Sequence, residues 1–152
     1  MVATKHVPAK TLQEFIAWAK AKPNGISIGS PGPGTSPHLS GVLFAARTGV
    51  NAVHVPFQGG AAAMNATIGN RIVLLATTLG GGAAAQIAGG KVKGLGVASA
   101  TRATVVPTVP TYAEAGYPKF EASSWVGIFV PAKTSAETIN TLNAAIEDVM
   151  KD

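Results

Sequence analysis

The sequence contains no cysteine. This absence excludes disulfide bonds, zinc sites with thiolate ligands and cysteine nucleophiles. Proteins of reducing and oxidising compartments alike can lack cysteine, so the redox environment of the protein stays open.

Carboxylates are missing from a long central part of the chain. None of the seven acidic residues lies within residues 15–113, whereas the same stretch carries seven lysines and arginines. Such a region has a positive field and attracts anions. It cannot supply a carboxylate pair for general acid–base catalysis or a carboxylate cage for calcium or magnesium. We therefore expect an anionic ligand and predict no metal site.

Charge is scarce overall, with 12% charged and 47% hydrophobic residues among 152. Disordered chains show the opposite balance, so the composition indicates a packed protein of one domain or most of one. The N-terminal "MVATKHVPAK" lacks the apolar core of a signal peptide. Residues 48–70 and 72–90 are uncharged, but their glycines and polar side chains argue against membrane spans.

Helices and strands are expected to alternate over the first hundred residues. A helix over Thr11–Lys22 is predicted by a capping box of Thr11 and Glu14 and by apolar residues at helical spacing. Further helices are predicted from Thr35 or Ser36 to Gly49, with a buried stripe of Leu39, Val42, Leu43 and Ala46, and over Ala61–Ile68 and Ala83–Ala88. The predicted strands are Ile26–Gly29, Ala52–Val55, Ile72–Ala76 and Val92–Ala98. This alternation indicates right-handed βαβ units, a parallel sheet and an α/β fold.

The pattern changes beyond residue 100. A proline-rich segment contains a second capping box, Thr111 with Glu114, and is followed by a predicted strand over Trp125–Val130. Thr134 with Glu137 is expected to cap a final helix that has one apolar face. A helix of this kind usually packs against another surface, so we expect the chain to be a piece of a longer polypeptide.

Three glycine-rich loops follow predicted strands, at residues 29–36, 56–60 and 77–82. In a parallel sheet such loops meet at the carboxyl edge, and each leads into a helix N-terminus that favours an anion. Glycines in any single loop are explained equally well as tight-turn residues. Three loops in succession favour a site for a small carboxylate, with hydroxyls from Ser30, Thr35, Ser36, Thr77 and Thr78.

Other chemistries fit the sequence less well. The glycines of "GSPGPG" lack the spacing of a dinucleotide-binding loop, and no P-loop lysine follows them. Ser30 is not in a nucleophile elbow, and no central acid can orient His38 or His54. The histidines lack metal spacing, and the scattered cations and aromatics argue against nucleic acid. We expect His54 to be a core residue and His38 to be able to donate to a ligand.

Several segments, in order, carry a family resemblance. They are "PAKTLQEFIAWAKAKP", "GSPGPGTSPHLSGVLF", "VHVPFQGGAAA", "GGKVKGLGVASATR", "VPTVPTYAEAGYP" and "SSWVGIFVPAKTSAETINTLNAAI". Together they cover nearly the whole chain and resemble the extracytoplasmic receptors of tripartite tricarboxylate transporters, the Bug or TctC-like family.

This resemblance implies a fold and a function. It implies a two-lobed periplasmic binding protein fold of type II and a periplasmic receptor that is not an enzyme and uses no cofactor. Such a receptor binds a small organic carboxylate and delivers it to membrane subunits. Residues 10–100 would form the ligand-binding lobe, and residues 101–152 the crossover and a partial return to the other lobe, whose N-terminal part is missing.

The resemblance also implies roles for individual residues. In the family, the first loop takes the ligand carboxylate, a role that would fall on Ser30, Gly34, Thr35 and Ser36 with His38 beside them. The full predicted ligand-binding set is Ser30, Gly32, Gly34, Thr35, Ser36, His38, Phe57, Gln58, Gly59, Gly60, Thr77 and Thr78. Gln58 replaces the usual family lysine, and Thr77-Thr78 replaces an acidic residue followed by asparagine. Losing the lysine and the acid removes a charged pair near the site.

Two alternatives stay open. The chain could be an α/β enzyme or binding module for a phosphorylated small molecule. It could also be a truncated structural module that associates with itself through its incomplete lobe. No nucleic-acid partner is expected.

Overall fold

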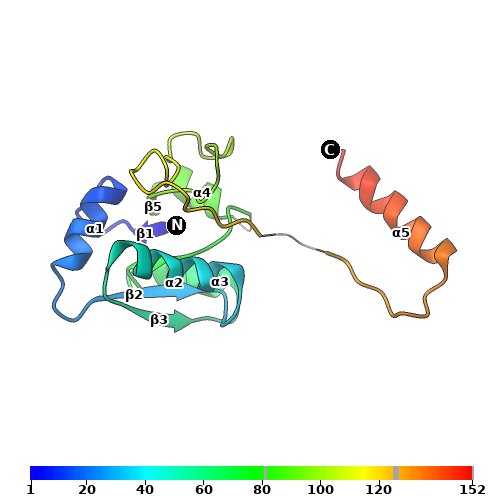
Figure 1. Ribbon diagram of the computed structural model, residues 1–152, viewed down its shortest axis with the longest axis horizontal. Helices are drawn as coiled ribbons and strands as arrows, with labels where there is room; N and C mark the ends of the chain where they lie inside the picture. The colour runs from blue at the N-terminus through cyan, green and yellow to red at the C-terminus, as the bar shows by residue number, and fades with distance from the viewer. Residues whose placement is uncertain (81, 125–126, 152) are drawn as a thin grey trace.

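The computed structural model describes residues 1–80, 82–124 and 127–151. In chain order its elements are β1 (Val2–Thr4), α1 (Leu12–Lys20), β2 (Ile26–Ser30), α2 (Ser36–Thr48), β3 (Ala52–Pro56), α3 (Gly60–Ile68), β4 (Leu74–Leu75), α4 (Ala83–Ala88), β5 (Val92–Gly94) and α5 (Ala136–Val149). The strands form one sheet in the order β3-β2-β4-β1-β5, and helices cover it (Figure 1).

The sheet is mixed, with a parallel part as predicted. β2 pairs in parallel with β3 on one side and with β4 on the other. β1 lies between β4 and β5 and is antiparallel to both, so β5 runs in the same direction as β4. The expected α/β fold is confirmed, but the expectation of an entirely parallel sheet is wrong at β1. This strand has only three residues, all buried, and so shows no alternating pattern that predicts a strand.

The core lies on both faces of the sheet. On one face, Phe15 of α1 and Phe44 of α2 are buried with Ile28 of β2 in the larger hydrophobic cluster. On the other face, α3 buries Ala63 and Met64 in a second cluster. The apolar stripe predicted for the first helix is confirmed, because Leu12, Phe15, Ile16 and Ala19 are all buried.

The buried stripe predicted for α2 is wrong. Leu39 and Val42 are 59% and 52% exposed, whereas Gly41, Phe44 and Thr48 are buried. The reason is the close approach of the helix to β2: a Cβ atom on Gly41 would lie 3.1 Å from Cγ2 of Ile28. The glycine lets α2 lie against the strand on its smallest face. Leu39 and Val42 then point outward, whereas Leu43 packs partly buried against the larger cluster.

The segment after β5 returns to the body of the protein. Val97 forms a bridge with Thr111, and the predicted Thr111–Glu114 capping box forms in both directions, with N···O distances of 2.7 and 3.1 Å. Tyr112 and Phe120 join the larger core cluster. Residues up to about 122 therefore pack with the sheet.

The C-terminal segment differs from its prediction. Residues 127–130 form no strand, and Trp125 and Val126, the start of the predicted strand, lie outside the described residues. The N-cap of α5 is Ser135, not Thr134, because the Ser135 hydroxyl accepts the N–H of Thr138 at 3.2 Å. No residue of α5 is buried, and the helix lies apart from the body in Figure 1.

Candidate functional site

The first glycine-rich loop is held in place by its own hydroxyl groups. Ser30 is fully buried at the end of β2, and its Oγ accepts the N–H of Gly32 at 3.2 Å. Thr35 is the N-cap of α2: its hydroxyl donates to the Gly32 carbonyl at 2.8 Å and accepts the N–H of His38 at 3.3 Å. These hydrogen bonds tie the end of β2 to the start of α2.

Two histidines extend this network. Nε2 of His54, on β3, lies 2.7 Å from Oγ of Ser30, and Nδ1 of His38 accepts the N–H of Gly34 at 2.9 Å. The two imidazole rings stack with their centroids 3.9 Å apart. Desolvation, together with the charge of protonated His38, lowers the pKa of His54. Both histidines line a small cavity of about 50 Å³ that also includes Ser30.

The second loop, after β3, is bound to the first. The N–H groups of Phe57 and Gly59 donate to the carbonyls of Ser30 and Pro31, each at 3.0 Å. Gly59 has a φ of 99°, a conformation that favours glycine, and α3 begins at the next residue. The two loops therefore form one hydrogen-bonded unit at the carboxyl edge of the sheet.

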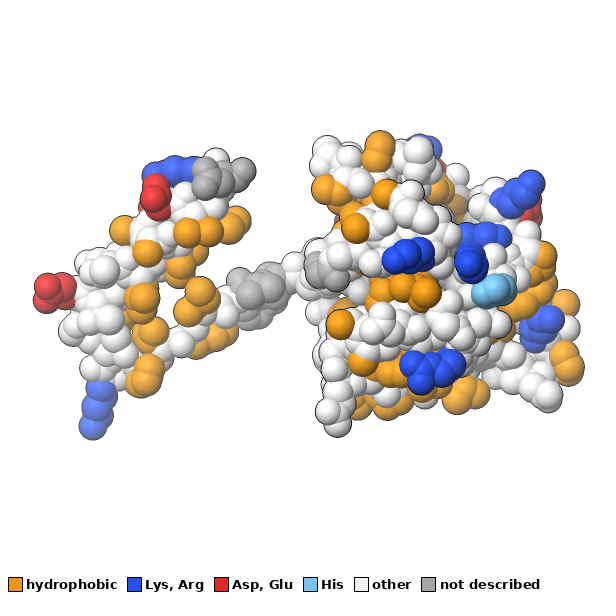
Figure 2. All heavy atoms as spheres, turned by 180° about the vertical axis from the view of Figure 1, so that it is seen from behind, with side chains coloured by type: hydrophobic (Ala, Val, Ile, Leu, Met, Phe, Trp, Pro, Cys, Tyr) orange, Lys and Arg blue, Asp and Glu red, His pale blue; other side chains and the backbone are white. Residues whose placement is uncertain are grey.

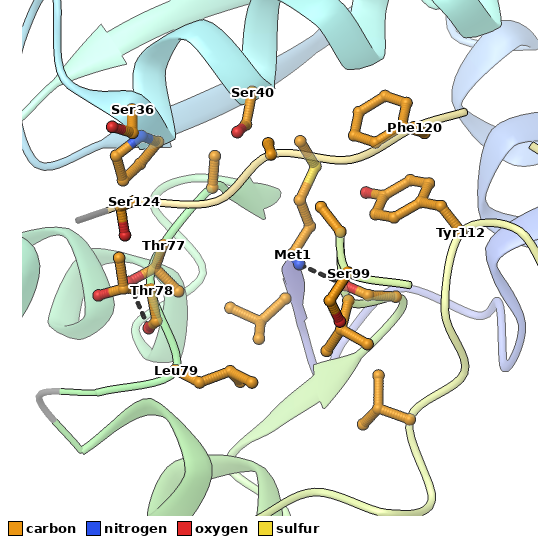
Figure 3. A pocket seen from close by; sticks show the side chains of 18 of the residues that line it. Met1, Ser36, Ser40, Thr77, Thr78, Leu79, Ser99, Tyr112, Phe120 and Ser124 are labelled. Carbon is orange, nitrogen blue, oxygen red and sulfur yellow. Dashed lines mark hydrogen bonds between the residues drawn. The ribbon is translucent and has the colours of Figure 1, made fainter. Parts of the chain in front are cut away.

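A larger cavity of about 200 Å³ opens between the start of α2, the loop after β4 and the segment after β5 (Figure 3). Hydroxyl-bearing side chains and apolar side chains line it together. The hydroxyl-bearing residues are Ser36, Ser40, Thr77, Thr78, Ser99, Tyr112 and Ser124. Among the described residues that line it, none is Lys, Arg, His, Asp or Glu. The Met1 amine also borders the cavity; it donates to the Gly96 carbonyl at 2.6 Å, and burial lowers its pKa to about 5.

The structure distributes the predicted site residues over three places. Ser36, Thr77 and Thr78 line the larger cavity. Ser30 and His38 line the smaller one, while Gly32, Gly34 and Thr35 form the loop beside it.

Residues 57–60 follow β3, the edge strand, and line neither cavity. The order β3-β2-β4 places the first loop between the other two.

Sequence reasoning missed the wall of the larger cavity that comes from beyond residue 95. Ser99, Tyr112, Phe120 and Ser124 belong to this wall. The available signal was the Thr111–Glu114 capping box, which fixes the backbone on either side of Tyr112. It predicts a local turn, but it does not show that the turn folds back over the sheet.

A family model described as "Tripartite tricarboxylate transporter family receptor" matches residues 1–152. The chain belongs to this receptor family. A relative from Pseudomonas sp. (strain P51), described as a UPF0065 protein in the tcbD-tcbE intergenic region, is 35% identical over 138 residues, which are 90% of this chain and 41% of the relative. The chain spans less than half the length of most curated relatives that it matches.

Solved structures similar to this receptor-family chain show the same fold. MatC from Rhodopseudomonas palustris with bound malate has a TM-score of 0.90 at 30% identity, covering 99% of this chain and 51% of that one. R. palustris Rpa4515 with adipate has a TM-score of 0.89 at 30% identity, covering 94% and 48%. The predicted resemblance and the periplasmic binding protein fold are confirmed.

Two further observations concern the described part of this receptor-family chain. No group of three or more His, Cys, Asp or Glu side chains there could hold a metal ion. None of the helices in residues 1–80, 82–124 and 127–151 is both long and apolar enough to cross a membrane.

Proposed function

We propose that this chain forms one side of the ligand site of an extracytoplasmic receptor for a small organic carboxylate. The observation that carries the proposal is the larger cavity, which is lined by the first residues of α2 and by several neutral hydroxyl groups. Hydroxyl donors and a helix N-terminus suit a carboxylate, and none of the described residues that line the cavity carries an acidic side chain to repel one.

The comparisons support the same ligand class. The chain belongs to a family of receptors, and two similar solved structures hold malate and adipate, both small carboxylic acids. On this basis we also propose a periplasmic location, delivery of the ligand to membrane subunits of a tripartite transporter, and a role without catalysis.

The lobe arrangement and the predicted site residues also belong to this proposal. A ligand-binding lobe of residues 10–100, followed by a crossover and partial return over residues 101–152, stays a prediction. In this arrangement Ser36, Thr77 and Thr78 contact the ligand directly, since they line the cavity. The loop of Ser30 to Thr35 holds the start of α2 in place.

Cations do not form a single stripe on the face of the molecule shown in Figure 2. Lysine and arginine side chains are spread over the body among apolar and polar atoms. Nucleic-acid binding usually needs a concentrated basic patch, and the face in Figure 2 shows none.

Isothermal titration calorimetry on the full chain tests the proposal. Malate and adipate should bind with dissociation constants of roughly millimolar to micromolar, as a few hydrogen bonds to a carboxylate allow. Replacing both Thr77 and Thr78 by alanine should weaken binding about tenfold or more. Thr141→Ala, which removes an exposed hydroxyl on α5, should leave binding unchanged.

Two results contradict the proposal. One is the absence of binding by either acid, or by citrate and other small carboxylic acids, to the folded chain. The other is inorganic phosphate binding more tightly than the acids, which favours a site for phosphorylated molecules.

A further inference from the structure

Tyr112 has a buried hydroxyl group without a partner. The residue is 1% exposed, and its hydroxyl oxygen finds no hydrogen-bond partner among the described residues. The ring lines the larger cavity, and Figure 3 shows its hydroxyl directed toward Met1 and the middle of the cavity. A buried hydroxyl that makes no hydrogen bond destabilises a fold, whereas phenylalanine fills the same space without this cost.

The packing around the ring fixes its position. The Tyr112 ring stacks on Phe120 with centroids 4.1 Å apart and meets Phe44 edge-on at 6.5 Å. A Cβ atom on Gly96 would lie 3.2 Å from the ring, so that glycine leaves room for it. The backbone N–H of Tyr112 donates to the Val97 carbonyl at 3.1 Å. The hydroxyl therefore has little freedom to turn toward a partner elsewhere, and the cavity that its ring lines is the place from which a partner can approach.

The cavity is large enough to hold such a partner. Its volume of about 200 Å³ is far above the roughly 10–15 Å³ that one water needs. In Figure 3, Ser36, Thr77 and Thr78 lie on one side of it, and Tyr112 and Phe120 on the other. A short, mostly apolar chain with a polar group at each end fits between these two sides.

The charges decide which polar group fits at the Tyr112 end. Burial raises the pKa of Tyr112, so its phenol is a neutral donor at any physiological pH. A second carboxylate there would meet no lysine, arginine or histidine among the described lining residues, and the Met1 amine that borders the cavity already donates to the Gly96 carbonyl at 2.6 Å. A buried carboxylate without a positive partner is strongly unfavourable, whereas a hydroxyl or carbonyl group is accommodated by one neutral hydrogen bond.

Resting on the proposed carboxylate site, we infer that the Tyr112 hydroxyl is a specificity-determining contact that selects monocarboxylates bearing a neutral hydrogen-bonding group at the far end. The carboxylate of such a ligand lies at Ser36, Thr77 and Thr78, and its hydroxyl or carbonyl group bonds to Tyr112. This preference differs from that for the dicarboxylates in the two similar structures.

Calorimetry with matched acids tests this inference on the full chain. The four-carbon series is butyrate, 4-hydroxybutyrate and succinate, and the six-carbon series is hexanoate, 6-hydroxyhexanoate and adipate. In at least one series the hydroxy acid should bind about fivefold to tenfold more tightly than the plain acid, as expected for one buried neutral hydrogen bond. It should also bind more tightly than the dicarboxylate.

Tyr112→Phe should abolish the preference for the hydroxy acid and leave the affinity for the plain acid unchanged. Its melting temperature should equal or exceed that of the unaltered chain, since the change removes an unpartnered hydroxyl. Tyr117→Phe is the matched control, because Tyr117 is the other tyrosine, packs beside the core and does not line the cavity. It should leave the preference intact.

Each other outcome overturns the inference. If the plain acids or the dicarboxylates bind more tightly than the hydroxy acids in both series, the site does not select a neutral group. If the preference persists in Tyr112→Phe, or if that variant melts several degrees lower, the hydroxyl has a different partner. In these cases the proposed carboxylate receptor still stands, whereas no binding by any of the six acids counts against both.

Discussion

The imidazole of His38 stacks on that of His54, with the ring planes inclined by 23°. Each ring also bonds to the first glycine-rich loop, through the Gly34 N–H and the Ser30 hydroxyl respectively. The pair therefore links the start of α2, the edge strand β3 and the loop in one network. Protonating both rings places two positive charges in contact, which the structure disfavours.

We expect the free energy of unfolding to fall as the pH drops below about 6.5, the ordinary pKa of histidine. The pKa of His54 is lowered in the folded state, so the unfolded chain binds more protons over this range. Stability is thus full above the unfolded value and is lost as the pH falls toward the folded one. Urea unfolding followed by circular dichroism between pH 7.5 and 5.5 measures the change.

Two variants test whether His54 causes the pH dependence of stability. His54→Gln should flatten the pH dependence, because glutamine keeps a hydrogen-bonding group near Ser30 but does not titrate. His6→Gln, which alters an exposed histidine outside the stacked pair, is the control. An equal slope in all three proteins contradicts the role given to the stacked pair.

Gly34 and Gly60 should respond in opposite ways to alanine. A Cβ atom on either one has no neighbour within 4 Å, so sterics with other residues do not distinguish them. Gly34 has a φ of 75°, where alanine costs about 1–2 kcal/mol. Gly60 is the first residue of α3, where alanine should be neutral or stabilise by up to about 1 kcal/mol.

Urea unfolding of the two glycine variants at pH 7.5 gives both free energies of unfolding directly. Equal effects of the two substitutions would show that the loop conformation at Gly34 does not constrain the fold.

The sequence predicted the fold where the periodic signal was long. The capped helix at Leu12–Lys20 and the alternation through β2, β3, β4 and β5 are confirmed. β1 and the orientation of α2 were not predictable. β4 and β5 are as short as β1, but their apolar runs follow predicted helices, whereas the three buried residues of β1 precede the first helix and show no alternation. The orientation of α2 depends on how closely Gly41 approaches Ile28, which is a tertiary contact.

The candidate site was also predictable only in part. Loops that follow parallel strands reach a common edge by topology alone, so Ser36 could be expected near Thr77 and Thr78. Tyr112 comes from a segment with no regular secondary structure, and its position depends on packing against Phe44 and Phe120. No local pattern contains that information.

Phe44 and Leu142 offer a test of how the stability of the chain is divided. Phe44 of α2 is fully buried in the larger hydrophobic cluster, and Phe44→Ala should lower the free energy of unfolding by about 3–5 kcal/mol. Leu142 is 40% exposed on α5, a helix without buried residues, and Leu142→Ala should change it by less than about 0.5 kcal/mol. Urea unfolding at several protein concentrations measures both. A large loss in Leu142→Ala that depends on protein concentration would show that α5 packs against another copy of the chain, because association makes stability depend on concentration.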